Sequence, residues 1–265
     1  MYILPLLLLV GAVSALPAAT QDQSSSDVAA IMAVPESSFT SYQTGGLIRQ
    51  PVDQDGEVTK RAWKCTPKPI RTSGDKDTGG KGITITNDGK ASRGFYIYHN
   101  SCDSVPWKYI WIDAGKTQFV SFPDGFEGRI QRGVDKFMLN GQPQTLGTWF
   151  EVSWDQHGVG WADVSLIRGC DGAVLIRSLD NSGAWKGFTQ WILDGAPAGA
   201  YNKKSDGQSV IKETEGRNAA INTIPRDWDL KKVGAQYAYV DDSHGSPVIA
   251  SQNGRFSTHW PEGRA

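Results

Sequence analysis

The stretch YIWIDAGKTQFVSFPDGFEGRIQR, residues 109–132, decides the fold class. It contains three short strand-like runs, at 109–112, 117–122 and 128–132. Runs of this length that are bounded by turn residues indicate strands. Asp113-Ala114-Gly115 separates the first two runs and is typical of a turn. The stretch therefore predicts successive antiparallel strands.

The same pattern continues on both sides of this stretch. Further strand-like runs occur at 83–86, 95–99, 149–154, 161–167, 173–177, 235–240 and 255–259. Short strands at such regular spacing predict an all-β protein, an antiparallel β-sandwich or barrel. The pattern weakens at about 178–234, where we expect a smaller, loop-rich insertion with one short helix.

The composition excludes several classes of protein. The 265 residues include ten tryptophans and only 21% charged residues, which excludes a disordered chain. The net charge of −1 argues against nucleic acid as a partner, because phosphate binding needs an excess of Lys and Arg. No dinucleotide-binding, phosphate-loop or serine-hydrolase motif occurs, so we expect no cofactor.

The N-terminal part of the chain is predicted to be a processing region. Residues 3–13 are almost wholly apolar and Val13-Ser14-Ala15 resembles a cleavage signal, so residues 1–15 are predicted to be a secretory signal peptide. The apolar run is too short for a membrane span, which predicts an exported protein without a membrane partner. Residues 16–61 form a candidate pro-segment that ends at Lys60-Arg61, and the domain would then be 62–265. The dibasic pair is either a processing site or two ordinary surface charges.

The three cysteines are Cys65, Cys102 and Cys170. Secretion favours disulfides, and three cysteines allow one bond within the chain. Cys102 and Cys170 both lie among strong strand patterns, so we predict that they pair, leaving Cys65 free or bonded to another molecule. No Cys-x-x-Cys motif occurs and the four histidines are scattered, so no metal site is expected.

Three acids in strand-rich sequence are candidate catalytic residues: Glu151, Asp163 and Asp171. Carboxylates near tryptophans are what a glycoside hydrolase needs, because one acid protonates the leaving oxygen while the other stays ionised. The alternative is that these acids are solvated or bonded to the neighbouring backbone.

The tryptophans have two interpretations. Trp149 and Trp154 are candidate stacking surfaces for a glycan, as are Trp185 and Trp191, whereas Trp111 and Trp161 are expected in the core. Asp241-Asp242 is either a site for a cation or sugar hydroxyl, or part of a turn.

Several sequence blocks, taken in order, resemble the thaumatin-like proteins. The blocks are the glycine turn and strand at 114–119, the Gly-Arg-Ile-Gln-Arg run at 128–132, the segment 145–169, and the closing Tyr-x-Tyr-x-Asp-Asp at 237–242. The resemblance covers about 83–261. It implies an antiparallel β-sandwich with a smaller loop-rich region and, between them, an acidic cleft linked to β-1,3-glucan binding, weak glucanase action and antifungal defence.

The resemblance also assigns site residues. It matches Arg132 to the cleft arginine, Glu151 to the cleft glutamate and Asp163 to the first cleft aspartate. The next cleft aspartate falls on Arg168, with Asp171 as a substitute three residues later. Few cysteines and a dibasic leader resemble the fungal, effector-type branch of this fold.

Three functions follow from these observations. The first is a secreted, monomeric protein that binds cell-wall β-glucan through Arg132, Glu151, Asp163 and the tryptophans, with little or no turnover. The second is an endo-β-1,3-glucanase in which Glu151 donates the proton and Asp163 or Asp171 is the base or nucleophile. The third is a non-catalytic effector that binds a host protein.

Overall fold

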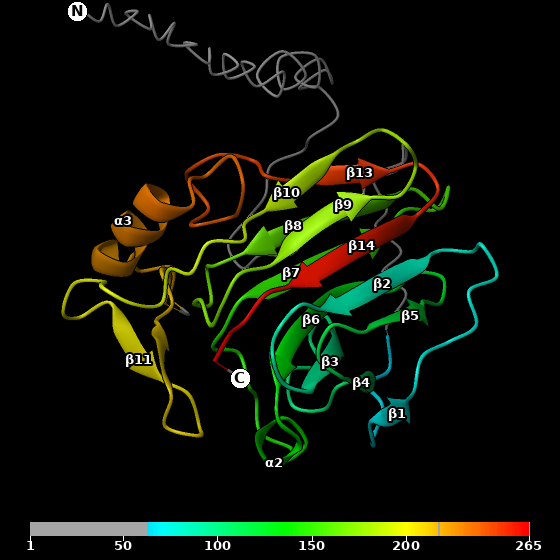
Figure 1. The fold of residues 1–265 in the computed structure, drawn as a ribbon, viewed down its shortest axis with the longest axis horizontal. Helices are drawn as coiled ribbons and strands as arrows, with labels where there is room; N and C mark the ends of the chain where they lie inside the picture. The colour runs from blue at the N-terminus through cyan, green and yellow to red at the C-terminus, as the bar shows by residue number, and fades with distance from the viewer. Residues whose placement is uncertain (1–62, 217, 265) are drawn as a thin grey trace, which may run out of the picture. The chain divides into compact units, whose positions relative to one another are not determined.

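The computed structural model describes residues 63–216 and 218–264 (Figure 1). The predicted signal peptide (1–15) and pro-segment (16–61) lie outside these described residues. None of the helices in the described part of the chain is long and apolar enough to cross a membrane.

The strands of the described chain form two β-sheets and a small hairpin. The seven-stranded sheet has the order β1 (Ile70–Thr72), β4 (Lys108–Ile112), β3 (Arg93–His99), β6 (Glu127–Gly133), β7 (Trp149–Trp154), β8 (Gly160–Ser165), β13 (Ile249–Ser251). The five-stranded sheet has the order β10 (Trp185–Gly187), β9 (Leu175–Ser178), β14 (Arg255–Trp260), β2 (Gly82–Asn87), β5 (Thr117–Ser121). The hairpin consists of β11 (Tyr201–Lys203) and β12 (Ser209–Ile211), and the two short helices are α2 (Asp135–Met138) and α3 (Thr223–Lys232).

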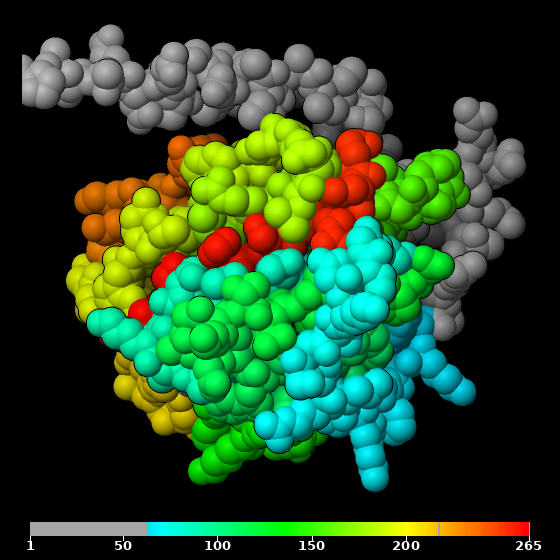
Figure 2. All heavy atoms as spheres, turned by 45° about the vertical axis from the view of Figure 1, so that its right-hand side comes forward, coloured from blue at the N-terminus to red at the C-terminus, as the bar shows by residue number. Residues whose placement is uncertain are grey.

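The predicted antiparallel β-sandwich is confirmed. Most neighbouring strands are antiparallel, but β14 pairs with β2, and β1 with β4, in parallel. Strand β14 therefore lies in the middle of its sheet, and Figure 2 shows its red residues between the yellow-green residues of β9 and β10 and the cyan residues of β2. The strand alternation of the C-terminal segment predicts the strand but not its partner.

The core lies between the two sheets and is built from alternate residues of each strand. Phe150, Val152 and Trp154 of β7 are buried in it. Phe150 contacts Phe256 of β14, with ring centroids 6.4 Å apart, and so joins the two sheets. The residues of β7 between them point to the opposite, outer face of the seven-stranded sheet.

One expected strand is wrong. Residues 235–240 form turns, and only Tyr239 makes an isolated bridge, to Ser165 at the end of β8. Ala238 and Val240 are buried while Tyr237 and Tyr239 are partly exposed, so the alternation reflects packing beside β8 and not a full strand.

The region 178–234 contains β10, which is the edge strand of the five-stranded sheet, and the hairpin β11–β12 and α3, which lie beside one end of the sheets (Figure 1). Pro225 is in the first turn of α3, where a missing backbone donor costs nothing, and Lys231 and Lys232 are in the last turn, where the helix dipole favours cations.

Asp229 of α3 leads to a prediction about stability and pH. Its side chain is fully buried, neither carboxyl oxygen has a hydrogen-bond partner in the described structure, and burial raises its pKa well above 3.8. Above about pH 4 the unfolded chain loses this proton while the native state retains it, so stability falls as pH rises. We expect Asp229→Leu to raise the free energy of unfolding at pH 7 by about 1–3 kcal/mol, with a smaller gain at pH 4.

Urea unfolding at both pH values measures this effect. Asp227→Asn, on the exposed side of the same helix, is the control and should change little. A gain that is the same at pH 4 and pH 7 would show that Asp229 does not retain a proton in the native state.

Candidate functional site

The outer face of the seven-stranded sheet brings three charged residues into one row. Arg129 of β6 pairs directly with Glu151 of β7, and Glu151 pairs directly with Asp163 of β8. Directly opposite residues in antiparallel strands have Cβ atoms about 4.5–5.5 Å apart. All three side chains are buried, so they form one compact charged group. Arg129, Glu151 and Asp163 are called the outer-face site below.

Arg129 is fixed by both aromatic and polar contacts. Its guanidinium lies 4.6 Å from the ring centroid of Tyr98 and 4.1 Å from that of Trp149. Its Nε donates to Gln131 at 2.9 Å and its Nη1 donates to Asp103 at 2.6 Å. These contacts hold the cation in one orientation beside Glu151.

The two carboxyl groups are strongly perturbed. Burial raises the pKa of Glu151 well above its usual range, the neighbouring Asp163 raises it further, and the charge of Arg129 opposes both effects. Burial also raises the pKa of Asp163 well above its usual range. Because like charges this close disfavour double ionisation, the pair retains a proton to higher pH than two exposed carboxyls would.

Two polar atoms of the outer-face site have no hydrogen-bond partner in the described structure. They are Oδ1 of Asp163 and Nη2 of Arg129, and both are buried. A buried polar atom without a partner costs about 1–3 kcal/mol, and such atoms are rare in native proteins. Because both atoms are closed off from solvent, a ligand with donor and acceptor groups could satisfy them only after neighbouring side chains move.

A second acidic group lies near the outer-face site. Arg168 donates from Nη1 to the backbone oxygen of Glu215 at 3.0 Å. Burial raises the pKa of Glu215, while the backbone N–H of Asp242, which donates to its carboxylate, and the charge of Arg168 oppose this rise. The charge of Arg168 also opposes the rise in the pKa of Glu151. Arg168 therefore interacts electrostatically with both Glu151 and Glu215. At this position the resemblance places an acid instead.

Asp241 itself has a turn role. Its Oδ1 accepts the backbone N–H groups of Ser243 and His244, each at 2.9 Å, and lies 2.8 Å from Nδ1 of His244. Among the described residues, no group of three or more His, Cys, Asp and Glu side chains is arranged to bind a metal ion.

The structure separates Arg132 and Asp171 from the outer-face site. Arg132 lies three residues after Arg129, an odd number, so its side chain points to the inner face. There its Nη1 donates to Pro261 O at 2.9 Å and its Nε lies 3.3 Å from Oδ1 of Asp171. Asp171 also pairs with Lys204 at 2.8 Å. The expectations that Arg132 lies beside Glu151 and that Asp171 shares its site are therefore corrected, since both belong to a buried ion network.

Two of the four tryptophans expected as stacking surfaces are corrected, whereas Trp185 and Trp191 are exposed. Trp149 and Trp154 are only 8% and 1% exposed, so they are not surface platforms. Trp149 stacks on Arg129, and Trp154 donates its indole N–H to Gly254 O at 2.8 Å from within the core. Trp111 and Trp161, expected in the core, are half-buried, and Trp161 lies two positions from Asp163 on the outer face.

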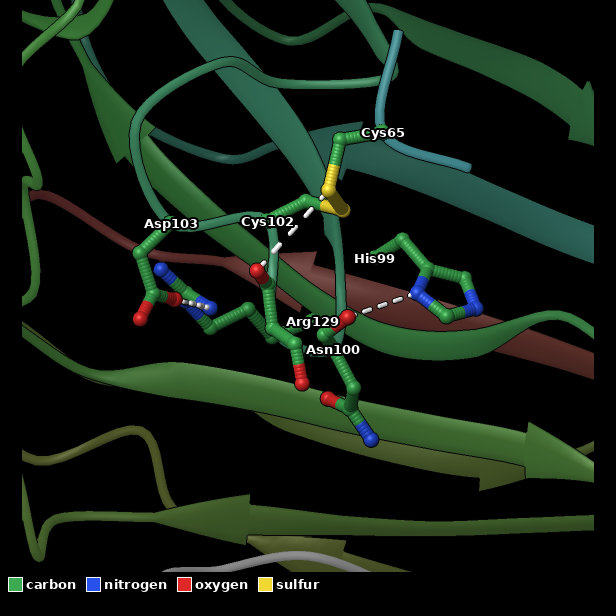
Figure 3. The surroundings of a disulfide bond; sticks show 7 residues. Cys65, His99, Asn100, Cys102, Asp103 and Arg129 are labelled. Carbon is green, nitrogen blue, oxygen red and sulfur yellow. Dashed lines mark hydrogen bonds and ion pairs between the residues drawn. A yellow bond between two sulfur atoms is a disulfide. The ribbon is translucent and has the colours of Figure 1, made fainter. Parts of the chain in front are cut away.

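The expected disulfide between Cys102 and Cys170 is wrong, because Cys65 bonds to Cys102 (Figure 3). Trp63 stacks on His99 with centroids 4.2 Å apart, which brings the segment before β1 next to Cys102. Cys170 is a buried free thiol whose pKa is raised by burial to about 12. Cys102 directly precedes Asp103, the partner of Arg129, so the disulfide anchors a loop that contacts the outer-face site (Figure 3).

The comparisons with known proteins give structural matches only. No family model and no curated protein matches the sequence. The thaumatin-like xylanase inhibitor TLXI is similar at 12% identity and a TM-score of 0.37, over 67% of this chain and 97% of that chain. The protein elicitor MoHrip2 from Magnaporthe oryzae is similar at 12% identity and a TM-score of 0.31, over 49% of this chain and 90% of that chain.

A third similar structure is a laminaripentaose-producing β-1,3-glucanase in complex with laminaritetraose. It has 14% identity and a TM-score of 0.36, over 58% of this chain and 55% of that chain.

Sequence reasoning missed Arg129, Glu215 and the outer-face position of Trp161. Side chains alternate between the two faces of the strand at 127–133, so Arg129 and Arg132 lie on opposite faces. The sequence alone does not show which of these faces packs in the core. The structure shows it, because Ile130 lies in the core while Arg129, on the other face, pairs with Glu151.

Proposed function

We propose that this protein is exported and binds a β-1,3-linked glucan of a cell wall through the outer-face site, with little or no turnover. The observation that supports this proposal is the buried, unpartnered pair of polar atoms, Asp163 Oδ1 and Arg129 Nη2. The choice of a β-glucan follows the sequence resemblance.

A sugar fits the chemistry of the outer-face site. Neighbouring sugar hydroxyls both donate and accept, so one ring could donate to Asp163 and accept from Arg129 once the side chains that cover these buried atoms move aside. Sugar rings also have apolar faces that stack on indoles, and the half-buried Trp161 lies on the same face. A partly protonated carboxyl pair limits the repulsion among the acids and leaves one carboxyl able to donate.

Export and processing belong to the same proposal. Persistent disulfides are typical of oxidising compartments, and Cys65–Cys102 fits this pattern. Cleavage after Arg61 would leave Trp63 and Cys65 close to the new N-terminus, where stacking on His99 and the disulfide attach this segment to the sandwich.

Isothermal titration of the chain with laminarihexaose, a β-1,3-linked glucose hexamer, tests the proposal. We expect saturable binding and a rise in melting temperature, because a ligand that binds only the native state stabilises it. Cellohexaose, the β-1,4-linked isomer, is the control and should bind more weakly. Absence of both binding and stabilisation with laminarihexaose would contradict the proposal and favour a protein partner.

The coupled carboxyl pair favours hydrolysis as a second candidate function. Glycosidases use one protonated and one ionised carboxyl group, which is the state that a coupled pair reaches. Release of reducing sugar from soluble β-1,3-glucan by the wild type, but not by Glu151→Gln, would show that the protein is an enzyme. Equal release by both would indicate a different site or a contaminant.

A further inference from the structure

Trp191 is an exposed indole on a firmly anchored loop. It is 46% exposed, whereas the next two residues, Ile192 and Leu193, are 2% and 1% exposed. The buried pair fixes the loop against the core, so Trp191 is directed outwards. An exposed indole on a fixed backbone loses little entropy when it binds a ligand.

Polar contacts also fix the orientation of the ring. The indole N–H of Trp191 donates to Oδ2 of Asp194 at 2.7 Å, and Oδ1 of Asp194 accepts from Nη2 of Arg264 at 2.6 Å. The guanidinium of Arg264 lies 5.4 Å from the Trp191 ring centroid, and its Nη1 donates to Ser209 O at 2.7 Å. Arg264 therefore supports the indole, and the Trp191 side chain stays 46% exposed beside it.

We propose that Trp191 is a second sugar-binding surface, on which one pyranose ring of a β-1,3-glucan stacks while its hydroxyls reach Asp194 at the edge of the indole. The ligand class rests on the proposed function, but Trp191, Asp194 and Arg264 are separate from the outer-face site. The carboxylate at the indole edge gives a hydroxyl an acceptor, which a purely apolar surface lacks. Two contacts with one long polysaccharide increase avidity without strengthening binding to short oligosaccharides.

Two measurements test this second surface in the full chain. In the first, NMR follows the indole N–H signal of Trp191, assigned by its loss in Trp191→Phe, during titration with soluble laminarin. We expect the signal to shift in the wild type and in Glu151→Gln. In the second, sedimentation with insoluble β-1,3-glucan particles should show an affinity about tenfold lower for Trp191→Ala.

The matched control is Ile224→Ala, which removes another exposed apolar side chain and should change particle binding less than about twofold. Both variants should bind laminarihexaose as the wild type does. An unmoved Trp191 signal, or particle binding by Trp191→Ala equal to that of Ile224→Ala, would overturn the inference. A Trp191 shift in a protein whose outer-face site binds no laminarihexaose would support the second surface and contradict the proposed function.

Discussion

Arg132→Met is expected to lower the free energy of unfolding by about 3–5 kcal/mol, because it removes one partner from a buried ion pair. The Arg132 side chain is 2% exposed and compensates Asp171, which is 1% exposed. It also donates to Pro261 O and Ala173 O, so the substitution leaves two carbonyl groups without this donor. Methionine fills similar space, so the loss reflects charge and hydrogen bonds rather than a cavity.

Guanidinium unfolding of the single variant and of Arg132→Met/Asp171→Asn measures this effect. The double variant should recover part of the loss, since it no longer buries a carboxylate that has lost one of its two cations, the other being Lys204. Asp113→Asn, an exposed turn substitution, is the control. A loss below about 1 kcal/mol for Arg132→Met would contradict the buried ion network.

Cys65→Ala/Cys102→Ala is expected to lower the free energy of unfolding by about 3–4 kcal/mol. The bond joins residues 37 positions apart, and a loop of this length restricts the unfolded chain by about that amount. The variant also frees the loop that contains Asp103, which accepts a hydrogen bond from Arg129. We therefore expect the Arg129 side chain to be held less firmly beside Glu151.

Non-reducing peptide mapping checks the pairing independently. We expect a Cys65–Cys102 peptide and a Cys170 thiol that alkylates only after unfolding, since Cys170 is buried. A Cys102–Cys170 peptide, or an unchanged stability after removal of Cys65 and Cys102, would contradict the structure.

Much of the fold could be predicted because strand signals are local. The runs at 83–86, 95–99, 109–112 and 149–154 all lie within strands of the structure. The parallel pairing of β14 with β2 could not be predicted, because residues at opposite ends of the domain meet only through the packing of the whole sandwich. The strand predicted at 235–240 is wrong for a related reason. Packing beside β8 buries alternate residues of this segment, which gives the same apolar pattern as a strand.

The candidate site could be predicted only in part. Glu151 and Asp163 were identified from acids among tryptophans, and the structure places them as direct neighbours. Arg132 was assigned through the resemblance, whereas the structure places Arg129, and not Arg132, opposite Glu151. The Cys65–Cys102 bond depends on stacking of Trp63 on His99, a contact between residues far apart in the sequence.

The most direct test of the outer-face site is the affinity for laminarihexaose of the wild type, Glu151→Gln and Asp113→Asn, measured by isothermal titration. Glu151→Gln keeps the size of the side chain but removes a titratable partner of Asp163 and Arg129. We expect the affinity of Glu151→Gln to fall about 10- to 100-fold, because Asp163 and Arg129, the proposed sugar partners, lose the carboxyl group that lies between them, while Asp113→Asn binds like the wild type. Equal affinities for all three proteins would contradict a sugar-binding role for the outer-face site.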